Sequence, residues 1–310
     1  MAKSNIVLRG VMFAVWLVLL VICVLAYTGS MGSSIEKVAK KNDSPLTPQG
    51  YTFYSFAIIG VLEGIGCLYA LFPAGYEGPK KDRWKTKTVN AIGPWWVIGF
   101  ACQILWLILW VQNVGATFII SLGLQVAGLI SFAIAYGLLM KMTSQQSKKK
   151  SVSAPSYIFF YIPTVMNLAW LTMASCIGLL AIISHYNKDV DQSDGEHSTW
   201  MQVFAVILAA LVTFVGLLIE GFHVSIFYGL TLIWTFTGLY IKAEKNKNGD
   251  AMMEQALLVC LILLVLISAF SIVVSVFRFF RKADDKEEPL HDSSSSSSSD
   301  EEQQAEAAVV

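Results

Sequence analysis

One acidic residue lies within an otherwise uncharged apolar stretch and is the first candidate for chemistry. If a helix begins near Phe53, Glu63 lies ten residues further along, which at 1.5 Å per residue is about 15 Å. That depth is close to the centre of a hydrocarbon layer ~30 Å thick. An ionised carboxylate there costs roughly 2.5 kcal/mol or more, so Glu63 should face the inside of a helix bundle or be protonated. Its role is either proton coupling or a hydrogen bond from the neutral acid to a neighbouring carbonyl.

Two glycines flank this carboxylate at the spacing of one helical turn. Gly60 and Gly64 form a small-xxx-small pattern, which lets a second helix approach closely. Arg9 and Arg278 lie at the ends of predicted spans, so no Lys or Arg within the membrane is available as a partner for Glu63. We therefore expect a neighbouring helix, and not a basic side chain, to cover this face.

Two stripes at helical spacing combine aromatic rings with amide groups. The first stripe comprises Gln103, Trp106 and Trp110. The second stripe comprises Asn167, Trp170, Ala174 and Gly178. Together they could line a pocket that stacks a flat or rigid apolar molecule and orients it with few hydrogen bonds. They could equally be packing seams, in which small residues permit close approach and an amide bridges two helices.

The elements that position these residues are predicted by composition. The chain has 310 residues, of which 55% are hydrophobic and 14% charged, and residues 88–140 and 151–184 carry no charge. Because a membrane-spanning helix needs about 20 apolar residues, we predict an all-α, polytopic transmembrane bundle. The predicted spans are 8–27, 53–74, 93–112, 116–140, 157–184, 200–219, 224–241 and 255–278. We expect the first to be a retained span, although it also resembles a signal sequence.

The basic residues predict how the bundle is oriented. With the amino terminus inside, fifteen Lys and Arg residues lie on the cytoplasmic side and seven on the other, so both termini are expected to be cytoplasmic. The transmembrane domain is predicted to cover residues 1–282, with residues 80–87 as a basic cytoplasmic loop. Residues 283–310 are acidic, rich in serine and without aromatics, which predicts a disordered tail.

The sequence argues against several functional classes. It contains no nucleophile elbow, phosphate-binding loop, HExxH or paired-carboxylate motif, so we do not expect an enzyme. All five cysteines lie inside predicted spans, which suggests neither a disulfide framework nor a zinc site. The expected partners are the lipid bilayer and a hydrophobic small molecule, with a homodimer as a further possibility and no nucleic acid.

Four motifs occur in the order found in one membrane-protein family. They are TPQGYTF at 47–53, Gln103-x-x-Trp106-x-x-x-Trp110, Pro163 with Trp170, Ala174 and Ser175, and Leu232-Ile233-Trp234 with Gly238. On these residues the chain resembles the longer branch of the tryptophan-rich sensory protein family, which is related to the translocator or peripheral benzodiazepine receptor proteins. The likeness runs from about Thr47 to Lys242.

The resemblance implies a five-helix core formed by the first five spans, with three additional helices. It implies a ligand site at Phe53, Phe56, Glu63, Gln103, Trp106, Trp110, Asn167 and Trp170, with a tetrapyrrole, a sterol or a related lipid as the ligand. The sequence departs from the family pattern at several of these positions. Phe56 replaces a Trp, Gln103 and Gly178 replace Asn, and Ala169 replaces a Gly. The fold therefore transfers more securely than the identity of the ligand.

Three functional hypotheses follow. A ligand-binding protein for sensing, sequestration or delivery comes first. A proton-linked secondary transporter would use the same pocket together with Glu63, although no internal repeat supports it. A structural subunit of a membrane assembly would turn the two stripes towards other chains and leave no internal cavity.

Overall fold

The computed structural model describes residues 6–72, 79–147, 154–187, 197–223, 226–245 and 251–284, and in these ranges the chain is helical with no strand. Eight of the helices are long and apolar enough to cross a membrane. The elements are α1 (Ile6–Thr28), α2 (Ile35–Lys41), η1 (Gly50–Phe53), α3 (Tyr54–Leu71), α4 (Pro79–Trp110), α5 (Gly115–Ser147), α6 (Ala154–Ser156), η2 (Tyr157–Tyr161), α7 (Ile162–Tyr186), α8 (Thr199–His223), α9 (Ile226–Lys245) and α10 (Ala251–Asp284). The predicted all-α, multi-span fold is confirmed.

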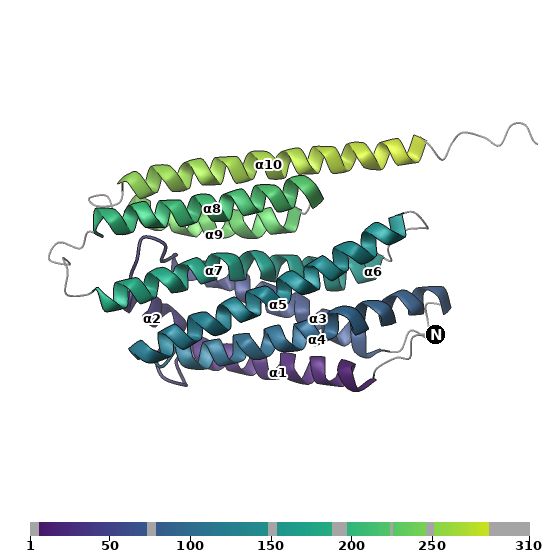
Figure 1. The fold of residues 1–310 in the computed structure, drawn as a ribbon, viewed down its shortest axis with the longest axis horizontal. Coiled ribbons are helices and arrows are strands. Elements are labelled where there is room, and N and C mark those ends of the chain that lie inside the picture. Colours follow the sequence, from purple (N-terminus) through teal and green to yellow (C-terminus); the bar gives the residue numbers. More distant parts are fainter. Residues whose placement is uncertain are drawn as a thin grey trace, which may run out of the picture.

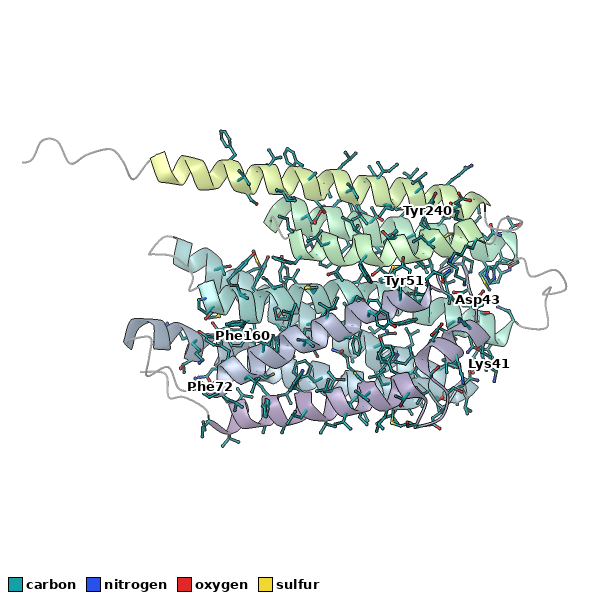
Figure 2. The ribbon with its side chains drawn as sticks, turned by 180° about the vertical axis from the view of Figure 1, so that it is seen from behind. Lys41, Asp43, Tyr51, Phe72, Phe160 and Tyr240 are labelled. Atoms are coloured by element: carbon teal, nitrogen blue, oxygen red, sulfur yellow. The ribbon has the colours of Figure 1, made fainter. Side chains whose placement is uncertain are left out.

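The helices form two packed groups. The first group contains α1, α3, α4, α5 and α7, with α4 packed against both α1 and α5, and α7 against α3 and α5. The second group contains α8, α9 and α10, and α9 joins it to α7 (Figure 1). The even number of spans brings the start of α1 and the end of α10 to the same end of the bundle (Figure 1). Figure 2 shows Lys41 and Asp43 at the opposite end from Phe72.

The glycine pair beside Glu63 does permit close approach of another helix, which is α1. The side chain of Trp16 lies directly against Gly64, where a Cβ atom would overlap the indole ring. Its Nε1 donates a hydrogen bond of 2.8 Å to the carbonyl of Gly60. An amphipathic indole therefore fixes the register of α1 on α3, because both its ring and its N–H have a defined partner.

One local prediction is wrong. The residues predicted as a basic loop, 80–87, belong to α4, which begins at Pro79. Proline is favoured in the first helical turn, and the Lys-rich stretch that follows has good helix propensity, so the helix continues past the apolar run. The Nζ of Lys85 donates to the carbonyl of Phe72 at 2.6 Å, which satisfies a group at the end of α3.

The sequence TPQGYTF allows two entries to the second span. Thr47 and Pro48 could form a helix N-cap and first turn, or Gly50 could mark a turn with the helix starting nearer Tyr51. The structure agrees better with the second, because the helical segment begins at Gly50. The Oγ1 of Thr47 instead accepts a hydrogen bond of 2.8 Å from the backbone N–H of Ser44, which closes a turn. At the other end of the chain α10 extends to Asp284, two residues into the predicted tail, and residues 285–310 lie outside the described ranges.

Candidate functional site

The two predicted stripes share one enclosed space between α4, α5 and α7. We call it the aromatic pocket, and its walls are Ile35, Phe53, Trp106, Trp110, Gln125, Trp170, Ala174, Ile177 and Gly178. The rings of Phe53 and Trp170 meet edge to face with centroids 6.0 Å apart, and those of Trp106 and Trp110 lie 6.3 Å apart. Helical periodicity explains the arrangement, since each stripe presents one face of its helix to the other.

The polar atoms of this pocket are unusual because they have no partner. The indole N–H groups of Trp106, Trp110 and Trp170 are buried without an acceptor among the residues that the structure describes. The Oε1 atom of Gln125 is equally buried and without a donor. Most buried polar groups in proteins are hydrogen-bonded, and each one that is not lowers stability by about 1–3 kcal/mol. The residues that line the pocket thus carry three donors and one acceptor that are not used within the described part of the chain.

The pocket is nearly closed in this structure. Its volume is about 20 Å³, whereas ligand sites usually measure roughly 300–1,000 Å³ and a water molecule needs ~10–15 Å³. Any molecule larger than water therefore requires the walls to separate.

The other predicted site residues lie beside the pocket and do not line it. Glu63 is 1% exposed, and its Oε1 accepts a hydrogen bond of 2.6 Å from the Nδ2 of Asn167. Gln103 is fully buried, and neither polar atom of its side chain has a partner in the described part of the chain. Phe56 touches the pocket wall from behind, with its ring centroid 6.2 Å from that of Trp106 and 6.3 Å from that of Trp170. All eight predicted residues are thus buried in one region of the first helix group.

One end of the pocket is covered by a segment outside the long helices. We call residues 35–53 the lid, because Ile35 at its start and Phe53 at its end both line the pocket. Asn42 in the middle of the lid is fully buried. Its Nδ2 donates to the Oδ1 of Asn113 at 2.9 Å, and its Oδ1 lies 2.9 Å from the Nδ1 of His185. The sequon formed by Asn42, Asp43 and Ser44 is therefore an internal contact and not an accessible acceptor for a glycan.

The lid is also tied to α9, and this contact joins two of the motifs noted in the sequence. The backbone N–H of Gln49 donates to the carbonyl of Gly238 at 3.3 Å, and the Nε1 of Trp234 donates to the carbonyl of Thr52 at 3.3 Å. Gly238 lies so close to Thr52 that a Cβ atom would overlap its hydroxyl. The glycine and tryptophan of α9 thus hold the end of the lid directly above the pocket.

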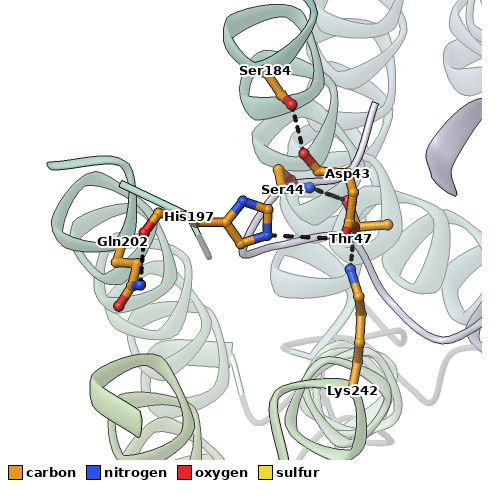
Figure 3. Close-up of polar contacts among 7 residues, drawn as sticks. All are labelled: Asp43, Ser44, Thr47, Ser184, His197, Gln202 and Lys242. Carbon is orange, nitrogen blue, oxygen red and sulfur yellow. Dashed lines mark hydrogen bonds and ion pairs between the residues drawn. The ribbon is translucent and has the colours of Figure 1, made fainter. Parts of the chain in front are cut away.

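Asp43 is the main polar anchor of the lid (Figure 3). Its carboxylate pairs with Lys242 of α9, and its backbone carbonyl accepts a hydrogen bond of 2.6 Å from the Oγ of Ser184 in α7. His197, just before α8, approaches the same carboxylate at 3.9 Å. Helix α9 and the segment just before α8 therefore contact the lid without lining the pocket.

Sequence reasoning missed three wall residues. Gln125 is an amide in the middle of an uncharged run, and its polarity at that depth was a signal that could have been used. Ile35 and Ile177 carried no such signal, because apolar residues near or inside a span are expected whether or not they face a pocket.

One of the comparisons with known proteins found a match. A family model described as TSPO-like protein matches residues 9–273. This match is longer than the likeness expected from the four motifs, and it includes α1 and most of α10. The searches of curated proteins and of solved structures returned no match.

Proposed function

Because the chain belongs to the TSPO-like protein family, we propose that it binds a flat, hydrophobic molecule in the aromatic pocket, for sensing or for transport of that molecule. The observation that carries the proposal is the set of three buried indole N–H groups, from Trp106, Trp110 and Trp170, that find no acceptor in the described part of the chain. A protein interior rarely leaves three such donors around one space.

The chemistry of the walls indicates which molecule fits. The indole rings offer flat surfaces for stacking, and their N–H groups offer neutral donors to a ligand that carries acceptors at its edge. The Oε1 of Gln125 complements them as an acceptor for a ligand N–H or O–H. A conjugated ring system with both kinds of group, such as a tetrapyrrole, satisfies this set better than a sterol or another lipid, which brings few polar atoms.

Binding requires the pocket to open from its volume of about 20 Å³. The lid is the element best suited to move, because it is short, lies outside the long helices and is held by a few polar contacts. Its anchors on α7 and α9 then set the free energy of opening, and the apparent affinity falls in proportion to the fraction of open molecules.

The first experiment is quenching of tryptophan fluorescence by protoporphyrin in the purified, detergent-solubilised protein. We expect saturable quenching, and we expect the Trp106→Phe/Trp170→Phe variant to bind about 5- to 150-fold more weakly, since two hydrogen bonds are lost at ~0.5–1.5 kcal/mol each. Trp95→Phe/Trp200→Phe is the matched control, because it removes two indoles outside the pocket. Quenching that does not saturate, or that weakens equally in both variants, would leave only the fold in common with the family.

The second candidate function is proton-linked transport, and the contact between Glu63 and Asn167 favours it. A buried carboxylate with one amide partner can exchange a proton as that partner moves. Glu63→Gln should then fold normally and change the pH dependence of transport. A transport activity with the same pH dependence in the variant would rule out this role for Glu63.

A further inference from the structure

A second space lies outside the aromatic pocket, between α1 and α3. This cavity has a volume of about 380 Å³ and runs from Tyr54, at the start of α3, to Glu63. Those nine residues of helix correspond to a length of about 14 Å. Phe56 lines the cavity and also touches Trp106 and Trp170 of the pocket wall, so its ring separates the two spaces.

The cavity opens towards the surface that the bilayer covers. Val24 and Val61 line it and are 54% and 56% exposed, whereas Leu19 and Glu63 line it and are 3% and 1% exposed. A molecule dissolved in the hydrocarbon layer can therefore enter sideways and reach Glu63, without opening of the lid.

The polar side chains along this cavity differ in how many of their hydrogen-bonding atoms already have a partner. The Nε1 of Trp16 is used by the carbonyl of Gly60 at 2.8 Å, and the hydroxyl of Tyr27 donates to the carbonyl of Phe53. Glu63 accepts from Asn167 through Oε1, and its Oε2 has no partner among the described residues. The carboxyl of Glu63, the most deeply buried of these groups, thus has one oxygen available for a further hydrogen bond.

We propose that the cavity between α1 and α3 is a second binding site, which takes a single-chain lipophilic alcohol from the bilayer. Its length of about 14 Å, with the carboxyl at one end, suits a single chain that carries one polar group. The hydroxyl of the ligand can both donate and accept, so it hydrogen-bonds Oε2 of Glu63 in either protonation state, and its chain lies along α3 towards Tyr54. The depth of the carboxyl favours a neutral lipid, because a charged headgroup would be drawn away from water. The chemistry differs from that of the aromatic pocket, which offers mainly donors to a flat molecule.

The test uses a long-chain alcohol that carries a diazirine, with the hydrocarbon of the same chain length as the matched probe. The full-length protein is reconstituted in phosphatidylcholine vesicles, irradiated with each probe and digested, and the adducts are located by mass spectrometry. We expect the alcohol to label residues of α1 and α3 along the cavity, and the hydrocarbon to label them at least fivefold less. The hydrocarbon has the same chain but no group that can hydrogen-bond Glu63.

Glycine substitutions provide the structural control. A Cβ atom at Gly60 meets nothing within 4 Å, so Gly60→Leu fills the cavity without a backbone clash. Gly137 is equally open but lies in α5, and Gly137→Leu is the matched variant. We expect Gly60→Leu to reduce labelling at least tenfold and Gly137→Leu to leave it unchanged.

Three results would overturn the proposal: equal labelling by alcohol and hydrocarbon, labelling that persists in Gly60→Leu, or adducts spread evenly over all lipid-facing helices. Both glycine variants are first checked for the thermal stability of the parent protein. The Trp106→Phe/Trp170→Phe variant should be labelled as strongly as the parent. This outcome separates the second site from the aromatic pocket, because either site can fail its test while the other passes.

Discussion

The hydrogen bond between Glu63 and Asn167 should couple α3 to α7 by a measurable free energy. Glu63 and Asn167 are 1% and 0% exposed, and the bond is 2.6 Å long. Glu63→Met removes the acceptor at similar volume and leaves the Nδ2 of Asn167 without a partner. Asn167→Leu does the reverse. Each single variant should lose about 1–3 kcal/mol of unfolding free energy, because a buried polar group becomes unpaired.

The double variant should cost little more than either single one, since both polar groups are gone. The expected coupling energy is roughly 1–2 kcal/mol, near the upper end of values for hydrogen bonds between membrane helices. It is measured by unfolding each variant in mixed detergent micelles and following the helical circular dichroism. Thr213→Val in α8, whose hydroxyl bonds within its own helix at 2.9 Å, should combine additively with Glu63→Met. A coupling energy below about 0.3–0.5 kcal/mol between Glu63 and Asn167 would refute the contact.

Two further predictions concern helix packing and the lid. Gly64→Ala should lower the free energy of unfolding by about 1–3 kcal/mol, because the new Cβ overlaps the indole ring of Trp16 in α1. Gly60→Ala should leave it unchanged or raise it by up to ~1 kcal/mol. Thermal melts that show the opposite order would contradict the packing of α1 on α3. Asp43→Asn should weaken the pair with Lys242, which is partly exposed, by about 1 kcal/mol or less. Hydrogen exchange of the lid backbone at 42–53 should then accelerate by up to roughly fivefold, while Lys40→Gln, which breaks an exposed pair inside the α2 part of the lid, should leave exchange at 42–53 unchanged.

The spans and the stripes could be predicted because they depend on local sequence. A run of about 20 apolar residues predicts a membrane helix without any knowledge of the helices that pack against it. All eight predicted spans correspond to long apolar helices. Helical periodicity likewise placed Trp106 and Trp110 on one face, opposite Trp170. The positions of these rings within their helices required no knowledge of the tertiary structure.

The lid could not be predicted in this way, and neither could the separation of Glu63 from the aromatic pocket. The lid is held by contacts between residues distant in the sequence, such as Asn42 with Asn113 and Asp43 with Lys242. No local sequence pattern predicts such pairs. Glu63 shows the same limit: its depth followed from helix geometry, but its position between Asn167 and the α1–α3 cavity depends on how three helices pack.

The most direct test of the aromatic pocket is an NMR titration of the indole N–H groups with protoporphyrin, in protein labelled with ¹⁵N-tryptophan in detergent micelles. The N–H resonances of Trp106, Trp110 and Trp170 should shift together and saturate as their donors gain acceptors. Those of Trp16 and Trp96 are internal controls and should stay in place, because their N–H groups already bond to Gly60 and to Thr164. Shifts confined to the control indoles, or no saturable shift in any of the three, would contradict a ligand site in the aromatic pocket.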